Sequence, residues 1–503
     1  MNVVKNAKKN LAFGVINRLI LLLCPFIERT VIQNILGAQY LGLSSLYSSV
    51  LSVLSLSELG FSAAMVYNMY KPAAEGNVTK MNALLNFYRK AYYIIGAIII
   101  FVGIAVIPFL PKLIKGTYPS DINLTTLYLI YLSNTAISYF LFAYLSSVIV
   151  VHQRDDINSF VNSFVKIFLA VSQITAVYFT HSYYAFAILM PVFTIINNLW
   201  IGWRVHRLFP QYKPQGNISG EDTSGIKKLV TGTFIQQACT VTRNSLDSIC
   251  ISAFLGLTLT AIYNNYYLII NGVTVFLRLI STAFMGGVGN HVAMRSVSEN
   301  YEEMKKLDFV YLWIGGWCSF CLICLYQPFM KLWMGKDMML STTSVLLLSL
   351  YFYLLKLGDI RSMYSSAKGL WWEQRYRAVG ETLLNLILNI LMGRAWGVNG
   401  IILATMISLF LCNYIWSVGI TFRLYFSISK RKNYYYYQST ETAFLFLFGC
   451  VTYLICSTVK FDSSILSLIT RGIICCMVPN LLMIIVYRNH AAFRYALNMI
   501  KRR

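Results

Sequence analysis

The feature that most constrains this chain is a series of apolar runs near twenty residues long. A run of that length, folded as an α-helix, spans the hydrocarbon core of a bilayer. About fourteen such runs occur in the 503 residues, of which 57% are hydrophobic and only 12% charged. The sequence therefore predicts an all-α polytopic membrane protein. The runs cover residues 11–36, 43–70, 91–109, 124–151, 157–179, 184–205, 226–255, 259–288, 310–329, 345–367, 376–396, 400–422, 442–459 and 465–487.

A polar segment rich in proline and glycine separates the sixth run from the seventh. We interpret this segment, residues 209–225, as a cytoplasmic linker. Six runs follow it before a basic, tyrosine-rich stretch that is typical of a membrane interface. The sequence thus predicts two pseudo-symmetric six-helix lobes, at 1–208 and 226–428, and two extra C-terminal helices with a basic tail at 429–503.

The charge distribution sets the expected orientation. The chain carries 42 Lys and Arg against 19 Asp and Glu, a formal net charge of +23. A strongly basic chain is often a nucleic-acid-binding protein. Here the basic residues gather in short loops on one side of the predicted spans, as the positive-inside rule describes. This bias argues against a nucleic-acid partner and places both termini in the cytoplasm.

Once the basic residues in loops and at helix ends are set aside, seven basic residues remain inside the apolar runs, and few acidic residues accompany them. A charge in hydrocarbon costs a few kcal/mol, so such residues mark a polar cavity, an ion pair or a side chain that reaches the headgroups. The excess of cations predicts an anionic ligand, phosphate above all, because arginine binds phosphate through two parallel hydrogen bonds. The cations are Arg18, Arg29, Lys166, Arg243, Arg278, Lys356 and Arg361, and the acids are Glu28, Glu58, Asp247 and Asp359.

Spacing places some of these residues on common helix faces. Arg18 and Arg29 are eleven residues apart and return to nearly the same face of one helix. Asn264, Asn271 and Arg278 step by seven, which also returns to one face. We therefore expect the two asparagines to line a cavity together with the cations.

Other cations have an acid within one helical turn. Arg243 and Asp247 are four apart, and Lys356 and Asp359 are three apart, so each pair can form a local ion pair. Snorkelling is difficult for Arg243 and Lys356, because both lie near the middle of the predicted membrane span. We favour a cavity role for the cations, with structural ion pairing as the alternative.

A short pattern recurs after 219 residues. Repetition at that distance predicts an internal duplication, which is the usual ground plan of a transporter. Because sequence identity between the copies is low, chance recurrence stays open as an alternative. The recurring features are Ile35-Leu36-Gly37 with Phe254-Leu255-Gly256, Tyr47 with Tyr266, and Glu28 with Asp247.

The sequence contains no arrangement typical of an enzyme or a metalloprotein. It has no phosphate-binding loop of the Gly-x-x-x-x-Gly-Lys-Ser/Thr type and no recognisable nucleophile motif. Cys318, Cys321 and Cys324 are spaced three apart, but they lie in an apolar run, where we interpret them as small core residues. We predict a protein that is not an enzyme and that uses no cofactor and no metal.

Several motifs in both halves of the chain carry a resemblance to a known family. The motifs are Tyr40-Leu41-Gly42-Leu43, Leu54-Ser55-Leu56-Ser57-Glu58-Leu59-Gly60-Phe61, Tyr70-Lys71-Pro72, Phe87-Tyr88-Arg89-Lys90-Ala91-Tyr92, Asn244-Ser245-Leu246-Asp247 and Ile262-Tyr263-Asn264-Asn265-Tyr266. They resemble motifs of the Wzx-type polysaccharide flippases of the multidrug/oligosaccharidyl-lipid/polysaccharide (MOP) superfamily. The resemblance covers nearly the whole chain, and the first-half motifs are the more specific.

This resemblance implies a transporter of the bacterial plasma membrane that works by alternating access. The implied substrate is an undecaprenyl-pyrophosphate-linked oligosaccharide for capsule, exopolysaccharide or O-antigen synthesis, and the implied cavity arginines are Arg18, Arg243 and Arg278. We expect membrane lipids and a polysaccharide polymerase as partners and a monomeric state. The coupling ion, H⁺ or Na⁺, would bind at Glu58, Asp247 or Asp359. The alternatives are a multidrug or cation exporter of the same superfamily, and a membrane-embedded polymerase or acyltransferase.

Overall fold

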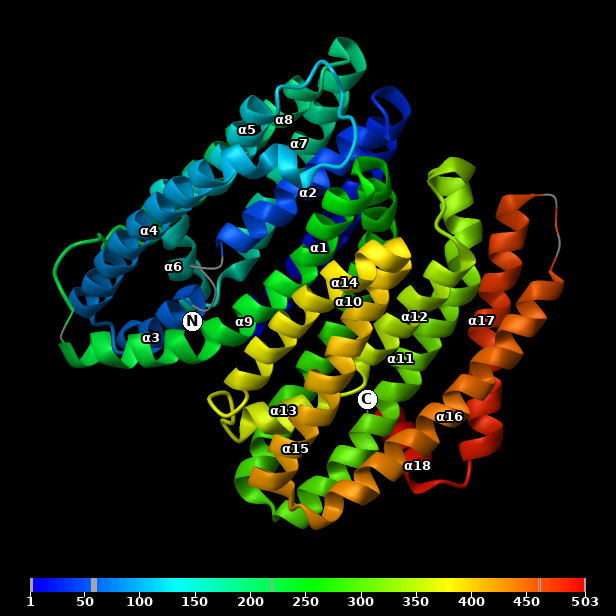
Figure 1. Ribbon diagram of the computed structural model, residues 1–503. Coiled ribbons are helices and arrows are strands. Elements are labelled where there is room, and N and C mark those ends of the chain that lie inside the picture. Colours follow the sequence, from blue (N-terminus) through cyan, green and yellow to red (C-terminus); the bar gives the residue numbers. More distant parts are fainter. Residues whose placement is uncertain (1–2, 56–60, 219, 460, 462, 502–503) are drawn as a thin grey trace. The chain divides into compact units, whose positions relative to one another are not determined.

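The computed structural model describes residues 3–55, 61–218, 220–459, 461 and 463–501, and every regular element in these ranges is helical (Figure 1). The all-α prediction is therefore confirmed for the described residues. Contacts divide the chain into two compact units, Met1–Ala261 and Ile262–Arg503. Each unit is described separately below.

The first unit consists of long helices joined by short turns and 3₁₀ segments. α7 packs along α1 and α8, and α9 packs against α2. The elements are α1 (Val3–Ile35), α2 (Ala38–Leu54), α3 (Phe61–Ala74), α4 (Val78–Val106), η2 (Ile107–Leu113), α5 (Leu124–Phe140), η3 (Ala143–Leu145), α6 (Ser146–Val151), α7 (Asp155–Thr180), α8 (Tyr183–Leu208) and α9 (Gly220–Leu255).

The second unit is built around α11, which packs against α12, α16, α17 and α18. α10 (Leu257–Met294) begins in the first unit and continues into the second. The remaining elements are α11 (Val297–Trp333), η4 (Lys336–Met338), α12 (Thr342–Lys356), α13 (Asp359–Ala367), α14 (Arg375–Ser408), η5 (Leu409–Trp416), α15 (Ser417–Thr421), η6 (Phe422–Phe426), α16 (Ser429–Thr458), α17 (Ser464–Tyr487) and α18 (Ala491–Lys501).

Ten helices in the described residues are long and apolar enough to cross a membrane, or eleven if the bent pair Leu124–Phe140 and Ala143–Val151 is one span. One of the ten, Arg375–Phe426, has 52 residues, or about 78 Å of helix, more than twice a bilayer core. Gly397 interrupts the helix with φ 59° and ψ −137°. The segment is therefore both long enough for two crossings and broken at a point where the chain can turn. The chain is a multi-pass membrane protein, whereas fourteen spans and cytoplasmic termini stay predictions.

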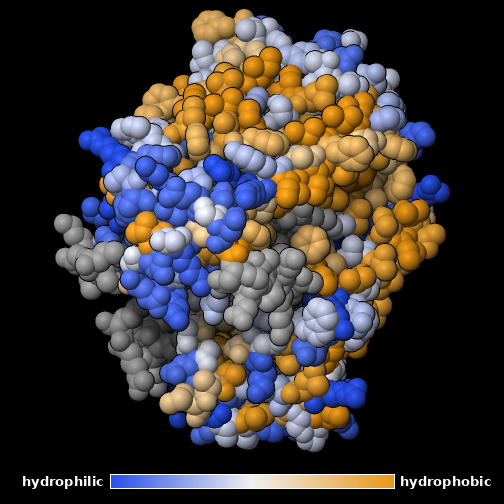
Figure 2. All heavy atoms as spheres, turned by 90° about the vertical axis from the view of Figure 1, so that its left-hand side faces the viewer, coloured by the Kyte–Doolittle hydropathy of each residue, from blue (hydrophilic) through white to orange (hydrophobic). Residues whose placement is uncertain are grey.

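Hydrophobic side chains on the outer faces of the helices fit this conclusion. Phe101 on α4 and Phe179 on α7 are each 77% exposed, and Ile485 on α17 is 65% exposed. Figure 2 shows hydrophobic side chains over a wide area of one face, with hydrophilic ones gathered in patches. Apolar surface on this scale requires a lipid environment or a partner.

The segment expected to be the linker is tied to α4. The side-chain oxygen of Asn82 accepts a hydrogen bond from the backbone of Lys213 at 2.8 Å, and the Asn86 amide donates to the Gly216 carbonyl at 2.7 Å. The boundary between the two compact units falls between Ala261 and Ile262, further along the chain than this segment. The predicted lobe boundaries stay predictions.

Helix starts repeat along the chain at nearly the offset expected from the sequence pattern. α2 and α10 start 219 residues apart, as do α4 and α11, while α5 and α12 start 218 apart and α7 and α14 start 220 apart. The turns before α2 and α10 match as well. Gly37 and Gly256 have φ of 108° and 95°, and their amides donate to the carbonyls of Ile32 and Ile251. These matches favour the duplication over chance.

Candidate functional site

The residues expected to line a cavity fall on α1 and α7, on α9, and on α10, α12 and α13. Each group is described within its own unit. Glu58, one of the expected ion-coupling residues, lies outside the described residues.

In the first unit an ion pair joins α1 to α7. The Lys166 ammonium donates to Glu28 Oε1 at 2.6 Å, and their side chains are 21% and 11% exposed. Arg154 and Asp156 form a further pair at the start of α7. Lys166 was expected to bind substrate, but an anionic ligand must compete with Glu28 for it.

Arg29 and Arg18 share α1 but differ in their surroundings. Arg29 is half-buried and donates to the Ala261 carbonyl at 3.3 Å. The hydroxyls of Tyr131 and Tyr183, which share a 2.7 Å hydrogen bond, lie near its guanidinium. Arg18 is exposed, and within the described part of the chain its side chain has no ion pair or hydrogen bond. Of these two arginines, Arg18 is the one available to a ligand.

Arg243 and Asp247 lie one turn apart on α9, and both are buried. Their exposed fractions are 6% and 3%, and Arg243 Nε donates to the side chain of Asn244 at 3.3 Å. Burial of a guanidinium beside a carboxylate fits a structural ion pair as well as a binding role. Both residues therefore stay predictions for the site.

In the second unit a polar cluster forms where α12 ends and α13 begins. The Lys356 ammonium donates to Asp359 Oδ2 at 3.2 Å, and the Tyr311 hydroxyl donates to the same oxygen at 2.6 Å. The predicted pairing of Lys356 with Asp359 is confirmed. The Asp359 side chain is 34% exposed, so one edge of the cluster is open.

Arg278 on α10 lies near this cluster, since its charge acts on Tyr311. Its side chain is exposed, and it has no ion pair or hydrogen bond among the described residues. Asn271, two turns earlier, is also exposed, whereas Asn264 is half-buried. Arg278 and Asn271 are thus available to a ligand in the second unit.

Arg361 on α13 is almost fully buried, with 1% of its surface exposed. Its guanidinium donates to the Asn413 carbonyl at 2.9 Å and to the Tyr414 carbonyl at 3.4 Å, both in the π-helical turn η5. A π-helix leaves backbone carbonyls out of the regular ladder, so they can accept from a side chain. Because these bonds fix Arg361 inside the helix packing, its expected role in substrate binding is not supported by its position.

Sequence inspection missed several buried carboxyls in the second unit. Asp308 hydrogen-bonds with Gln438, Glu381 pairs with Arg377 at 2.8 Å, and the Tyr487 hydroxyl donates to Glu441 at 2.6 Å. The i,i+4 spacing of Arg377 and Glu381 was a usable signal. The other two carboxyls, Asp308 and Glu441, lie just outside the predicted apolar runs 310–329 and 442–459, so they were not counted among the interior acids. The expected cationic excess was therefore overestimated for the interior of this unit.

An apolar groove lies close to the same polar groups. Two adjoining pockets of about 740 and about 430 Å³ open between α12, η5 and α16 and between α11, α12 and α16. Both are lined by Leu350, Tyr353, Thr442 and Phe446, and the hydroxyls of Tyr353 and Thr442 share a hydrogen bond of 2.8 Å. The groove offers a hydrocarbon chain an apolar lining with few polar atoms.

No family model and no curated protein sequence matches this chain. Its fold is similar to that of the lipid II flippase MurJ in an inward-closed conformation, with a TM-score of 0.69 and 15% identity over 95% of this chain and 99% of that one. It is also similar to an inward-facing multidrug resistance MATE family transporter of the MOP superfamily, with a TM-score of 0.60 and 12% identity over 82% and 98% of the two chains. A MATE transporter from Vibrio cholerae is similar as well, with a TM-score of 0.57 and 9% identity over 84% of this chain and 97% of that one.

Identities this low establish the fold alone. The chain has the fold shared by a lipid flippase and by drug transporters of the MOP superfamily, as the sequence motifs implied. The structures to which it is similar are transporters or flippases, which fits the prediction of a protein that is not an enzyme.

Proposed function

We propose that this protein is a plasma-membrane flippase that moves undecaprenyl-pyrophosphate-linked oligosaccharides from the cytoplasmic to the outer leaflet. The proposal rests on the transporter fold and on the two arginines, Arg18 and Arg278, that are exposed on candidate spanning helices. An unpaired guanidinium at such a place costs several kcal/mol unless water or a ligand solvates it. Pyrophosphate is an anion that a guanidinium binds strongly.

The apolar groove of the second unit fits the polyprenyl chain of such a ligand. Its two pockets could hold part of a polyprenyl chain, since their lining is almost entirely hydrocarbon. A ligand with an anionic head and a long apolar tail therefore fits both features of the second unit. The apolar groove is not expected for a carrier of small hydrophilic solutes.

The membrane potential favours outward movement of an anionic head. Each negative charge gains roughly 2.3 kcal/mol per 100 mV when it leaves a negative-inside cell. A proton or sodium ion bound at Asp247 or Asp359 would return the empty carrier, and Asp359 is the more accessible of the two. A polysaccharide polymerase would consume the delivered repeat units.

Export of cationic drugs is the second candidate. It is favoured by the MATE-like fold and by the buried carboxyls Asp308, Glu381 and Glu441 in the second unit. Each of these carboxyls has a hydrogen-bond or ion-pair partner with which a bound cation would have to share it, although Oδ1 of Asp308 has no partner within the described residues. The exposed arginines Arg18 and Arg278 favour an anionic substrate and therefore the flippase.

Deletion of the gene in its source bacterium tests the proposal. We expect polyprenyl-pyrophosphate-linked sugars to accumulate in total lipid extracts measured by mass spectrometry, and surface polymer to decrease. Both defects should disappear when the gene is restored on a plasmid. Unchanged lipid-linked sugars together with new sensitivity to cationic drugs would instead establish the exporter.

A further inference from the structure

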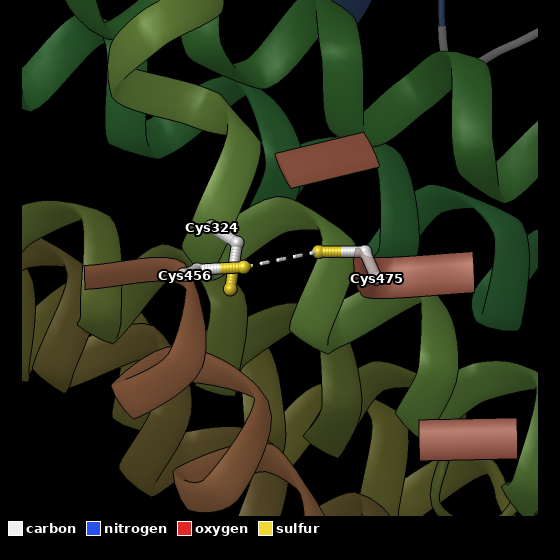
Figure 3. Close-up of side chains that lie close together, drawn as sticks. All are labelled: Cys324, Cys456 and Cys475. Atoms are coloured by element: carbon white, nitrogen blue, oxygen red, sulfur yellow. Dashed lines mark hydrogen bonds between the residues drawn. The ribbon is translucent and has the colours of Figure 1, made fainter. Parts of the chain in front are cut away.

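Three cysteine thiols from three different helices meet in the second unit (Figure 3). Cys324 lies on α11, Cys456 on α16 and Cys475 on α17, and their Sγ atoms all lie within 4.8 Å of one another. The Sγ atoms of Cys456 and Cys475 are 3.9 Å apart. All three residues are at least 97% buried, so their thiols face one another within the helix packing.

We propose that these thiols form a structural site for a tetrahedral divalent metal ion of the zinc class, with Cys321 as the fourth ligand. Cys321 lies one turn before Cys324 on α11 and packs against the cluster. A Zn–S bond of about 2.3 Å requires sulfur atoms about 3.8 Å apart in a tetrahedron, which is close to the separation of Cys456 and Cys475. A closed four-thiolate site also suits a buried place in the helix packing, because it needs no water ligand.

A cation beside the cluster offsets part of the charge. Four thiolates and a divalent ion carry a net charge of −2, which is costly to bury. Arg471 lies one turn before Cys475 on α17 and donates to the Val459 carbonyl, three residues after Cys456, at 3.2 Å. Its buried Nε has no hydrogen-bond partner within the described residues. A guanidinium in this position stabilises thiolate over thiol.

The consequence of metal binding would be mechanical. α16 and α17 fall in the C-terminal part, residues 429–503, that the sequence predicts to follow the two lobes, and both pack against α11. A metal bound to all three helices would fasten this C-terminal pair to the rest of the second unit. Each cysteine would release its proton to solvent on binding, so affinity should rise with pH.

Spectroscopic titration with Co²⁺ tests the site in the purified, reduced full-length protein in detergent. We expect one Co²⁺ per chain, with the absorption of tetrahedral thiolate coordination, and its displacement by Zn²⁺. Cys324→Ser, Cys456→Ser and Cys475→Ser should each lower the affinity by at least about 100-fold, since ligand loss exceeds the effect of losing a supporting contact. Cys476→Ser is the matched control, because Cys476 is exposed beside Cys475, and it should bind as wild type does.

Thermal unfolding provides a second measurement, in which each folded variant is compared with itself in the absence and presence of Zn²⁺. Zn²⁺ should raise the Tm of the wild type and of Cys476→Ser, and should leave that of Cys475→Ala unchanged. Absence of Co²⁺ binding by the wild type would overturn the proposal. So would equal binding by the Cys456→Ser/Cys475→Ser double variant, or a Cys456–Cys475 disulfide in protein purified without reductant.

Discussion

The break that follows α5 and the break that follows α12 occupy matching places in the two halves of the chain, but their chemistry differs. Each is two residues long, Leu141-Phe142 in one half and Leu357-Gly358 in the other. In the first half the break is apolar, and Phe142 adopts φ 46° and packs on Gly202. The second half has charged residues on both sides of its break.

Matched by their distance from the break, Lys356, Asp359 and Arg361 replace Phe140, Ala143 and Leu145. Glycine at the second break makes room for this charge, because a Cβ at Gly358 would lie 2.8 Å from Nη2 of Arg361. The same helix plan therefore serves packing in one half and a polar cluster in the other.

The acids at matching positions are also balanced differently. Glu28 pairs with Lys166 on another helix, and the position 219 residues after Lys166 holds Asn385, which donates to Thr405 at 2.9 Å. Asp247 instead has Arg243 one turn before it on its own helix, where the first half has Cys24. Both halves have an acid at the matching position, but the nearby cation is on another helix in the first half and on the same helix in the second.

The largest expected effect comes from making the second break resemble the first. Arg361→Leu should destabilise the protein by about 3 to 5 kcal/mol, because the Asn413 and Tyr414 carbonyls lose their donor and Asp308 loses a nearby cation. Thermal unfolding in detergent measures it. Arg207→Leu, at an exposed position on α8, is the control and should change stability little. Unchanged stability of Arg361→Leu would show that the buried charge is not structural.

A somewhat smaller effect is expected from the ion pair of the first half. Lys166→Ala should cost about 3 kcal/mol, because Glu28 is left buried without its partner. The double variant Lys166→Met/Glu28→Leu should recover most of that stability, since no charge then remains. If the double variant is as unstable as the single one, packing rather than charge accounts for the loss.

Substitution of Gly42, where α2 passes close to the backbone of Leu257, is expected to have the smallest of the three effects. A Cβ at Gly42 would overlap the Leu257 carbonyl oxygen, whereas one at Gly14 meets nothing within 4 Å. Gly42→Ala should therefore destabilise by about 1 to 3 kcal/mol and Gly14→Ala by no more than about 0.5. The position 219 residues after Gly42 holds Ala261. The stability of Gly42→Ala therefore shows whether the first half accepts the residue that the second half has at the matching position. Equal stability of both variants would contradict the close contact.

Local features of this fold were predictable from the sequence, and tertiary ones were not. Spacing found the apolar runs, the turns at Gly37 and Gly256, and the pairing of Lys356 with Asp359, because each depends on residues near one another in the chain. The bond from Lys166 to Glu28 spans 138 residues, and it requires knowledge of which helices pack together. For the same reason the sequence did not bring Cys456 and Cys475 to Cys324.

The central claim is that exposed arginines bind the anionic head of the substrate. Its most direct test is complementation of the deletion strain with Arg278 variants, measured as the amount of accumulated lipid-linked sugar. At normal protein levels and stability, Arg278→Ala should lower the transport rate about 10- to 100-fold, the equivalent of one charged hydrogen bond, and Arg278→Lys should restore it only in part. Arg207→Ala should transport normally. Full transport by Arg278→Ala would contradict the claim.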